Sequence, residues 1–582
     1  MSKNQHGLAR GLTNYGDMDF SLYLRRANAA SMGYGKEILG KTVVGIGDTG
    51  SGFNNCHRHM PELIEAVKRG VLMAGGLPIV FPTISLGETF LSPTSMMYRN
   101  LMSMDTEEMI NAQPMDAAVL IGGCDKTLPA QLMGAANSKI PVISLITGPQ
   151  LTGHSEGERL GACTDCRRFW AKFRAAEIDK AGIEKIESRL VTTSGTCAVM
   201  GTASTMACIT ETLGMALPGT AAIPAIHADR LRAAEASGAQ AVDLAQIDRD
   251  KQLTPKKIIT PASVENALRI LLAVGGSTNA IIHLTAIAGR LGIPIPLKQL
   301  NQLSDETPVL IDLKPTGDHY MEDLFKAGGL GVVLRELKPL LNVDCLSVSG
   351  ETLAERLQSE PAYVNREVVR SFDQPIQKMG GLVSLFGSLA PGGAILKRSA
   401  ADPTLFESEG KAVVFKSLED LANRIDDPDL EVEAHDILVL QNAGPKSDAA
   451  MPEAGYLPIP KKLAQSGVKD MIRISDARMS GTAYGTIVLH VTPEAAVGGP
   501  LALVKDGDKI KISVRNRSID LLVDETELEN RRQKFVSNVT TKHNRGYKKL
   551  YYETVLQADG GCDFDFLRDP SLLKNEAKTD DY

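Results

Sequence analysis

The stretch that decides the fold is AAVLIGGCDKT, residues 117–127. Its apolar start predicts a short buried strand, and a helical pattern begins near Leu128. The two glycines between them let the backbone come close to a bulky group. Cys124, Asp125 and Lys126 therefore lie where a strand gives way to a loop, which is where α/β enzymes carry functional side chains. Taken alone, the same residues are equally compatible with a polar turn that contains a cysteine by chance.

Two more cysteines lie in similar loops. Cys56 follows the glycine-rich residues 50–52 and precedes a helical pattern, and Cys197 stands at the head of another helical run. Cysteines so far apart in sequence converge only through the fold. Zinc sites are usually closed by pairs of neighbouring ligands, whereas an iron–sulfur cluster with one iron not ligated by protein suits three separate cysteines. For His57 and His59, which follow Cys56, we favour hydrogen bonding around the site over metal ligation.

Several long motifs, in order along the chain, resemble those of the iron–sulfur dehydratase family of dihydroxy-acid, phosphogluconate and sugar-acid dehydratases. They are NCHRH at 55–59, GGCDKT at 122–127, SGTCAVMGTAS at 194–204, GGSTNA at 275–280 and SDARMSGTAYGT at 475–486. The likeness runs from about residue 15 to about residue 570. It implies two domains with the active site between them.

Composition agrees with a large enzyme. The chain has 582 residues, 43% of them hydrophobic, which is enough for a substantial core. Its 63 basic and 70 acidic side chains give a net charge of −7, which disfavours nucleic acid as a partner. We see no apolar leader and no run of the roughly 18 apolar residues that a membrane span requires, so we expect a cytoplasmic protein without a membrane partner. Eight cysteines in so long a chain do not form a disulfide scaffold.

The pattern of elements predicts an α/β fold with two domains. Strands and helices alternate as strand 42–46, helix 61–73, strand 77–84, helix 93–103, strand 117–121, helix 128–136 and strand 141–146. This alternation indicates a mostly parallel sheet. Before it comes an irregular arm with a helical piece at 22–32; after it come surface excursions over the site at 150–190 and then a helix-rich region to about 295.

The second half looks different. Short strands at 412–415, 437–440, 486–490 and 509–514 predict a smaller β-rich, barrel-like domain. We therefore expect a large N-terminal α/β domain over residues 1–375 and a C-terminal domain over 376–582, with a frayed tail at 574–582.

Two motifs compete with this interpretation. Residues 45–50 match the G-x-G-x-x-G pattern, and Glu65 stands at the spacing of a ribose-binding acid, but no helix is expected to open within the motif, so we disfavour a dinucleotide site. Cys163 and Cys166 form a C-x-x-C pair without a second pair at zinc-site spacing, and we assign them to a surface loop. The remaining cysteines, taken as packing residues, are Cys208, Cys345 and Cys562.

The resemblance implies the cofactors. Cys56, Cys124 and Cys197 would hold a 2Fe–2S cluster, with 4Fe–4S as the alternative. Dehydration also calls for a hard cation, most simply Mg²⁺, and the oxygen ligands on offer are Glu88, Asp125 and Glu453. In similar enzymes the lysine at the position of Lys126 is carbamylated, which turns a repelled ammonium into an oxygen ligand. The alternative is a lysine that turns away to pair with a carboxylate.

The resemblance also implies which residue is the catalytic base and which reaction the protein catalyses. Ser480 would remove the C2 proton as an alkoxide, with Thr482 orienting it, and the alternative is a helix-capping serine. We expect a hydro-lyase that converts an aldonate to a 2-keto-3-deoxy acid, and the second choice is a branched-chain dihydroxy-acid dehydratase or an enzyme with both activities. Candidate partners for the substrate hydroxyls are Tyr484, Asn442 and His490.

Other classes of protein remain open at this point. Lys446 and Arg478 leave room for a phosphorylated substrate. An iron–sulfur electron carrier or redox sensor would use the cysteines without the acidic residues or Ser480, and a nucleotide-dependent oxidoreductase would bind NAD and be colourless. The family suggests a homodimer or a homotetramer.

Overall fold

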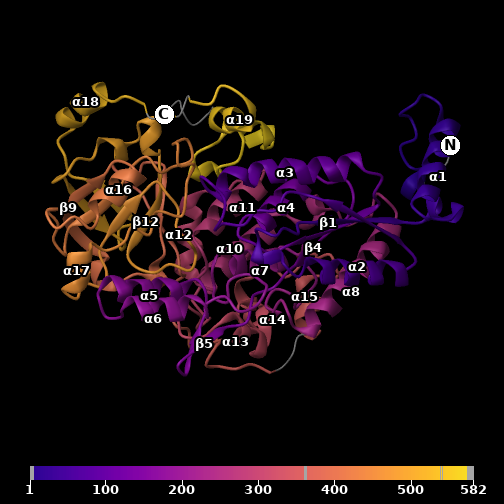
Figure 1. The fold of residues 1–582 in the computed structure, drawn as a ribbon, viewed down its shortest axis with the longest axis horizontal. Coiled ribbons are helices and arrows are strands. Elements are labelled where there is room, and N and C mark those ends of the chain that lie inside the picture. Colours follow the sequence, from indigo (N-terminus) through magenta and orange to yellow (C-terminus); the bar gives the residue numbers. More distant parts are fainter. Residues whose placement is uncertain (1–5, 360–362, 538, 540–541, 573–582) are drawn as a thin grey trace.

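The computed structural model describes residues 6–359, 363–537, 539 and 542–572, so the predicted frayed tail lies outside the described residues. The indigo and magenta part of the chain forms a helix-covered body, and the orange part forms a second, strand-rich body beside it (Figure 1). Within the described ranges, no helix combines the length and the apolar character needed to cross a membrane.

Four parallel strands form the first sheet, in the order β2-β1-β3-β4. They are β1 (Val43–Asp48), β2 (Leu77–Pro82), β3 (Ala117–Gly122) and β4 (Val142–Ile146). β3 is buried along its whole length, which explains why its sequence is continuously apolar instead of alternating. The prediction of a parallel α/β sheet is confirmed.

Helices connect these strands, and one of them, together with a helix that precedes the sheet, differs in extent from the prediction. The connecting helices are α2 (Met60–Met73), α3 (Ser95–Ala112) and α4 (Thr127–Ala135). α3 extends well past the predicted residue 103, because Thr106 and Ile110 stay buried beyond the charged residues and Pro114 stands only after its end. α1 (Met18–Ser31) begins before residue 22, because Asp17 caps it by accepting a hydrogen bond from the Phe20 amide at 3.0 Å.

The helix-rich region predicted from Cys197 to about residue 295 is confirmed, and in the structure helices continue beyond it to Ser359. These helices are α7 (Thr202–Thr212), α8 (Ala228–Gln246), α9 (Pro255–Ile258), α10 (Pro261–Ala273), α11 (Asn279–Gly289), α12 (Leu297–Glu306), α13 (Met321–Lys326), α14 (Gly329–Glu336) and α15 (Leu353–Ser359). α8 lies close against α2, since a Cβ on Gly70 would stand 1.9 Å from the Glu235 carbonyl oxygen. Glycine is required there by the close approach of two backbones.

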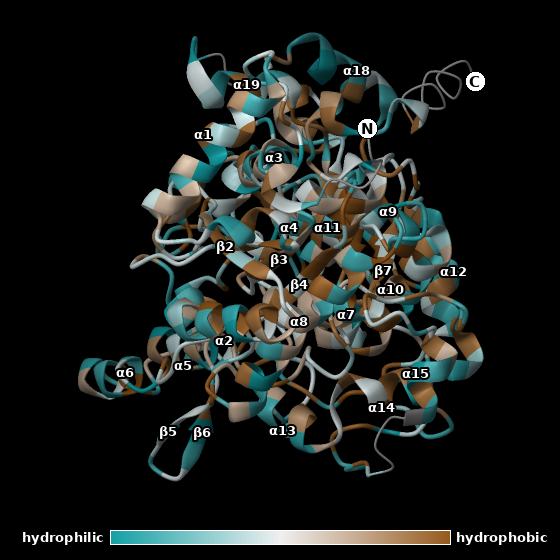
Figure 2. Ribbon diagram, turned by 90° about the vertical axis from the view of Figure 1, so that its right-hand side faces the viewer, coloured by the Kyte–Doolittle hydropathy of each residue, from teal (hydrophilic) through white to brown (hydrophobic). Residues whose placement is uncertain are grey.

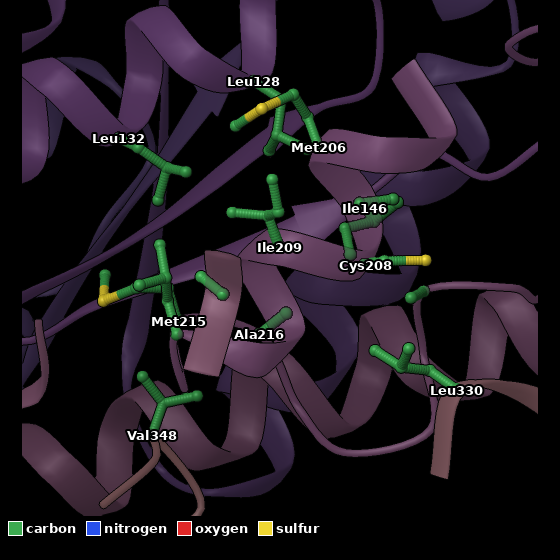
Figure 3. Close-up of a cluster of buried hydrophobic side chains, with 14 of the residues drawn as sticks. Leu128, Leu132, Ile146, Met206, Cys208, Ile209, Met215, Ala216, Leu330 and Val348 are labelled. Atoms are coloured by element: carbon green, nitrogen blue, oxygen red, sulfur yellow. The ribbon is translucent and has the colours of Figure 1, made fainter. Parts of the chain in front are cut away.

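The core of the first body lies between the sheet and these helices. Figure 3 shows Leu128 and Leu132 of α4 beside Met206 and Ile209 of α7, and all four are fully buried. Cys208 belongs to the same cluster, as a packing thiol should. Hydrophobic residues are concentrated on these central elements, whereas the outlying hairpin of β5 (Gly153–Ser155) and β6 (Glu158–Leu160) and the helix α6 (Lys180–Glu187) are largely hydrophilic (Figure 2).

The excursion predicted at 150–190 contains a hairpin and two helices. They are β5 (Gly153–Ser155), β6 (Glu158–Leu160), α5 (Thr164–Arg174) and α6 (Lys180–Glu187). α5 reaches the second body, because Arg174 pairs with Asp426 at 2.6 Å. In Figure 1, α5 accordingly lies next to the orange second body.

Eight strands form the second sheet, in the order β14-β13-β9-β10-β11-β12-β8-β7. They are β7 (Val383–Leu385), β8 (Gly393–Leu396), β9 (Glu407–Phe415), β10 (Ile437–Leu440), β11 (Arg473–Ser475), β12 (Ile487–Thr492), β13 (Lys509–Ser513) and β14 (Ser518–Leu521). The ends of the sheet meet, since the Phe386 amide donates to the Arg517 carbonyl oxygen at 2.9 Å and the Ile519 amide donates to the Phe386 carbonyl oxygen at 2.9 Å. The predicted barrel-like character is confirmed, with α16 (Leu418–Arg424), α17 (Lys461–Gln465) and α18 (Glu525–Gln533) attached to it.

The end of the chain returns to the first body. α19 (Gly546–Thr554) lies beside α3 (Figure 1), and Tyr551 and Phe564 pack with Met96 of α3. Asp563 forms an ion pair with Arg290 at 2.9 Å, and both side chains are completely buried. These contacts tie the last described segment to the first sheet and its helices.

Candidate active site

Cys56 lies in the loop that follows β1. A 3₁₀ turn, Asn55–His57, carries it, and the Asn54 side chain accepts a hydrogen bond from the Cys56 amide at 3.1 Å. Asn54 Nδ2 also donates to the Leu86 carbonyl oxygen at 3.1 Å, which ties this loop to the one after β2. α2 begins only at Met60, so no helix opens within the glycine-rich stretch, and its N-terminus is not aimed at a pyrophosphate there.

His57 holds the loop of Cys124 in place. Its Nε2 accepts hydrogen bonds from the amides of Gly123 and Cys124, both at 3.2 Å, and its Nδ1 lies 3.0 Å from the Thr49 carbonyl oxygen. Burial lowers the pKa of His57 to about 4, so the ring is neutral and Nδ1 carries the proton. Both nitrogens are therefore engaged by backbone groups and neither is left for a metal.

The thiols near this loop occur in contacting pairs. Contact with the Cys124 thiol, together with burial, raises the pKa of Cys56. Cys197 Sγ lies 3.5 Å from Cys163 Sγ, and Cys166 Sγ lies 3.0 Å from the Cys163 carbonyl oxygen. The prediction that Cys163 and Cys166 belong to a surface loop is therefore wrong, because Cys163 caps α5 and contacts Cys197, and Cys166 lies in the first turn of that helix.

Three loops interlock around these cysteines. A Cβ on Gly123 would lie 1.7 Å from Thr147 Oγ1 and 3.1 Å from Thr196 Cγ2, so only glycine allows the Cys124 loop to lie this close to its neighbours. The Gly195 amide donates to the Asn55 carbonyl oxygen at 3.4 Å, which connects the Cys197 loop to that of Cys56. No three His, Cys, Asp or Glu side chains of the described residues already surround one point as a finished metal site.

Arg478 joins two distant carboxylates. Its Nη2 lies 2.7 Å from Glu88 Oε1 and its Nη1 lies 2.6 Å from Glu453 Oε1. Burial opposes ionisation of Glu88, but the charges of Arg478 and Lys126 outweigh it and lower its pKa to about 2. Burial and the charge of Glu88 raise the pKa of Glu453. Glu88 follows β2 and Arg478 follows β11, so this contact joins the two bodies.

Lys126 faces the same acidic residues. Its side chain is fully buried, its Nζ lies 3.9 Å from Glu88 Oε2 and 4.0 Å from Asp125 Oδ2, and Nζ has no hydrogen-bond partner among the described residues. Burial lowers the pKa of Lys126, and the charge of Arg478 adds to this effect. Burial likewise raises the pKa of Asp125. Glu88, Asp125 and Glu453 thus form an acidic group around Lys126. The two measured distances, from Lys126 Nζ to Glu88 and Asp125, are longer than a hydrogen bond.

The loop after β11 brings two hydroxyl groups to the boundary between the bodies. Ser480 Oγ and Thr482 Oγ1 lie 2.8 Å apart. A Cβ on Gly481 would stand 2.6 Å from Ser277 Cβ and 2.6 Å from the Thr202 amide, so this loop lies directly against α7 and the segment before α11. The predicted GGSTNA and MSGT motifs are therefore neighbours in space.

Two further residues contact this loop and were not predicted as site residues. Arg167 Nη1 donates to Thr482 Oγ1 at 3.0 Å. Lys397, fully buried, donates from Nζ to the Gly481 carbonyl oxygen at 3.2 Å, and burial lowers its pKa to about 7. Arg167 stands one residue after the C-x-x-C pair, and Lys397 follows β8 without any motif of its own.

The predicted substrate residues do not gather at one place. The Tyr484 ring lies edge-on to Tyr456 at 6.2 Å, close to the serine loop. His490 is buried, and its Nε2 has no hydrogen-bond partner among the described residues. Burial, with a contribution from the charge of Arg478, lowers its pKa to about 3. Asn442 donates to the Lys416 carbonyl oxygen at 3.0 Å and lines a separate cavity, so the structure does not bring it to the acidic group.

Comparison with known proteins gives two adjoining family matches. The dihydroxy-acid/6-phosphogluconate dehydratase N-terminal model matches residues 41–356, and the corresponding C-terminal model matches residues 367–562. The chain is 44% identical to the 6-deoxy-6-sulfo-D-gluconate dehydratase of Pseudomonas putida, over 92% of each chain. It is 44% identical to the L-arabonate dehydratase of Azospirillum brasilense, over 91% of this chain and 92% of that protein. It is 36% identical to a dihydroxy-acid dehydratase of Clostridium kluyveri, over 92% of this chain and 96% of that protein. The chain therefore belongs to the dihydroxy-acid/6-phosphogluconate dehydratase family.

Proposed function

We propose that the protein dehydrates an aldonate, a sugar acid with hydroxyl groups at C2 and C3, to the 2-keto-3-deoxy acid. The observation that carries this proposal is the position of Arg478, which binds Glu88 and Glu453 and stands two residues before Ser480. The acidic residues and the hydroxyl pair of Ser480 and Thr482 therefore lie at the same boundary between the two bodies. The names of relatives at 44% identity support a sugar acid over the branched-chain dihydroxy acid named for a relative at 36%.

The thiols fit an iron–sulfur cluster. Cys56, Cys124 and Cys197 stand on interlocking loops, and thiolate is the ligand that such clusters require. Those three residues would hold it, as a 2Fe–2S cluster or, in the alternative, a 4Fe–4S cluster. When bound with one iron not ligated by protein, the cluster supplies a Lewis acid for the C3 hydroxyl.

The acidic residues fit magnesium. Glu88, Asp125 and Glu453 offer hard oxygen ligands, and the buried Lys126 Nζ between them has no hydrogen-bond partner in the described chain. We assign a carbamate to Lys126, formed when its neutral amine adds to carbon dioxide and releases a proton, because an oxygen ligand would end the clash of an ammonium with a cation. When bound, magnesium supplies charge that makes the C2 proton of the substrate more acidic.

The residues of the serine loop carry the proton transfer. Ser480 Oγ takes the proton from C2, and the C–H electron pair becomes the C2–C3 double bond. The C3–O bond breaks, and the leaving hydroxide takes up the proton held by Ser480 Oγ and departs as water, so that Ser480 returns to its ionised form. The resulting enol tautomerises to the ketone. Thr482, at 2.8 Å from Ser480 Oγ, orients that oxygen toward the substrate.

The direct test is 2-keto acid formation by anaerobically purified protein supplied with Mg²⁺. The substrate panel contains pentonates, hexonates and 2,3-dihydroxyisovalerate, because the branched-chain activity is the main alternative. We expect turnover of aldonates and a coloured protein with charge-transfer absorption. Turnover confined to 2,3-dihydroxyisovalerate would replace the sugar acid by the branched-chain substrate, and a colourless protein without 2-keto acid formation would contradict the proposal.

The pair Cys163 and Cys197 allows a sharp test of the ligand set. Their sulfurs lie 3.5 Å apart, yet only Cys197 is assigned to the cluster. Cys197→Ser is expected to lose most of the iron, sulfide and visible absorption, whereas Cys163→Ser is expected to keep wild-type iron content, because a ligand thiolate has been removed only in the first variant. Iron and sulfide analysis of the two purified variants is the measurement. Loss of iron in Cys163→Ser with retention in Cys197→Ser would exchange their roles.

A further inference from the structure

The first turn of α5 lies against the loop that carries Ser480. Arg167 Nη1 donates to Thr482 Oγ1 at 3.0 Å, and Thr164 Oγ1 donates to the Thr482 carbonyl oxygen at 2.9 Å. This turn contains the C-x-x-C motif, which has no role in the proposed chemistry. The contact therefore links an unassigned part of the sequence to the proposed base.

Arg167 leaves Thr482 one way to arrange its hydrogen bonds. A guanidinium group carries only donors, so Thr482 Oγ1 accepts from Arg167. The single hydroxyl proton of Thr482 is then available to Ser480 Oγ, which lies 2.8 Å away. The Thr482 amide also points at Ser480 Oγ, at 3.4 Å. Two donors aimed at one oxygen favour its ionised form.

Arg167 differs from two other arginines of α5 in how its charge is paired. Arg168 pairs with Asp165 at 2.9 Å, and Arg174 pairs with Asp426 at 2.6 Å. In the described part of the chain, no carboxylate forms an ion pair with Arg167, whose other contacts are the Cys163 carbonyl oxygen at 3.3 Å and the Tyr456 ring at 5.6 Å. Its positive charge is thus left to act on the hydroxyl pair of Ser480 and Thr482.

We propose that Arg167 is a positioning residue for the dehydration, which holds Thr482 as a hydrogen-bond donor and stabilises the ionised Ser480 oxygen. The inference rests on the proposed function, in which Ser480 takes the C2 proton. In this assignment Arg167 touches neither the substrate nor the reacting atoms. Its effect is on the fraction of enzyme in which Ser480 is ionised and ready to accept the proton.

Several charged or titratable groups surround this loop, and a pH profile includes all of them. They are Cys163 at the N-cap of α5, Cys166, Arg167 and Arg168 of α5, Tyr456 and Tyr484, Lys397 after β8, Arg473 of β11, and Arg478 in the loop itself. Only Arg167 differs between the two proteins compared first, wild type and Arg167→Gln. A difference between matched variants therefore reports the charge of Arg167.

The test is the pH dependence of kcat/KM for the aldonate that the protein turns over, in Arg167→Gln and wild type. Ser480 acts ionised, so activity rises with pH through its pKa. A positive charge within about 4–6 Å lowers the pKa of such a group by about 1–3 units, so its removal is expected to move the acid limb upward by about one unit. At a pH on the acid limb, kcat/KM of Arg167→Gln is then expected to be about tenfold lower than that of wild type.

Arg174→Gln is the matched control, since it removes an arginine from the same helix that pairs with Asp426, and its acid limb is expected to match wild type. Arg167→Lys, which keeps the charge, is expected to shift the limb by less than the glutamine variant. An unshifted limb in Arg167→Gln, with Ser480→Ala inactive, overturns this inference and leaves the proposed function intact. Activity in Ser480→Ala overturns the base itself. If Arg167→Gln is insoluble, Arg167→Met takes its place, and an unshifted limb in that variant overturns the inference.

Discussion

Ser480→Ala is expected to lower kcat by about 10²–10⁴-fold, the usual contribution of a positioned acid or base. The reason is that the variant keeps the Arg478 contacts to Glu88 and Glu453 and removes only the oxygen that accepts the C2 proton. The cysteines lie on other loops, so iron content and visible absorption are expected to stay at wild-type values. Steady-state 2-keto acid formation and the absorption spectrum, measured on one anaerobic preparation, check both parts.

Ser447→Ala provides the control. Ser447 is a buried serine of the same half of the chain, and its hydroxyl donates to the Gly444 carbonyl oxygen at 2.7 Å instead of to a group of the site. Its kcat is expected to stay near wild type. A Ser480→Ala enzyme as active as Ser447→Ala would exclude Ser480 as the base, and a variant that loses its colour would give Ser480 a structural role in place of a catalytic one.

The fold was largely predictable because its signals are local. The run before Gly122 is apolar at every position, as a strand buried on both faces requires, and the glycines after it mark the loop. The extent of α3 was missed for the opposite reason. Its residues 105–108 are mostly charged, and the burial of Thr106 and Ile110 depends on packing that no local pattern carries.

The site was predictable only where a motif carried it. The loops of Cys56, Cys124 and Cys197 each carry a motif, and they interlock in the structure. Cys163 was misplaced, because a C-x-x-C spacing without a second pair gives no sign that a helix brings it beside Cys197. The contacts of Arg478 could not be predicted from the sequence either. Its sequence neighbours do not indicate that carboxylates from both bodies converge on one guanidinium, which only the contact between the bodies creates.

Lys126→Met is expected to lower magnesium affinity or kcat by at least about 100-fold, because even outer-shell partners of a metal contribute about 10–100-fold. Methionine is unbranched like lysine and one atom shorter, and it places no charge in the buried position. Lys126 Nζ has no hydrogen-bond partner in the described chain, so its removal relieves a cost of burial and the variant is expected to remain folded. The loss would then come from the missing oxygen ligand. Magnesium titration of kcat, with a thermal melt of the same sample, measures both.

The carbamate itself has a readout that is independent of turnover. Wild-type protein in labelled bicarbonate is expected to show one carbamate carbon by NMR, and Lys126→Met is expected to lack it. Lys397→Arg is the matched control, because Lys397 is also fully buried with a lowered pKa but donates to the Gly481 carbonyl oxygen, away from the acidic group. This control is expected to keep the signal. A signal that disappears in Lys397→Arg and persists in Lys126→Met would move the carbamate to the other lysine. An active wild-type enzyme without any signal would leave Lys126 as a bare amine, held among Glu88, Asp125 and Glu453 by charge alone.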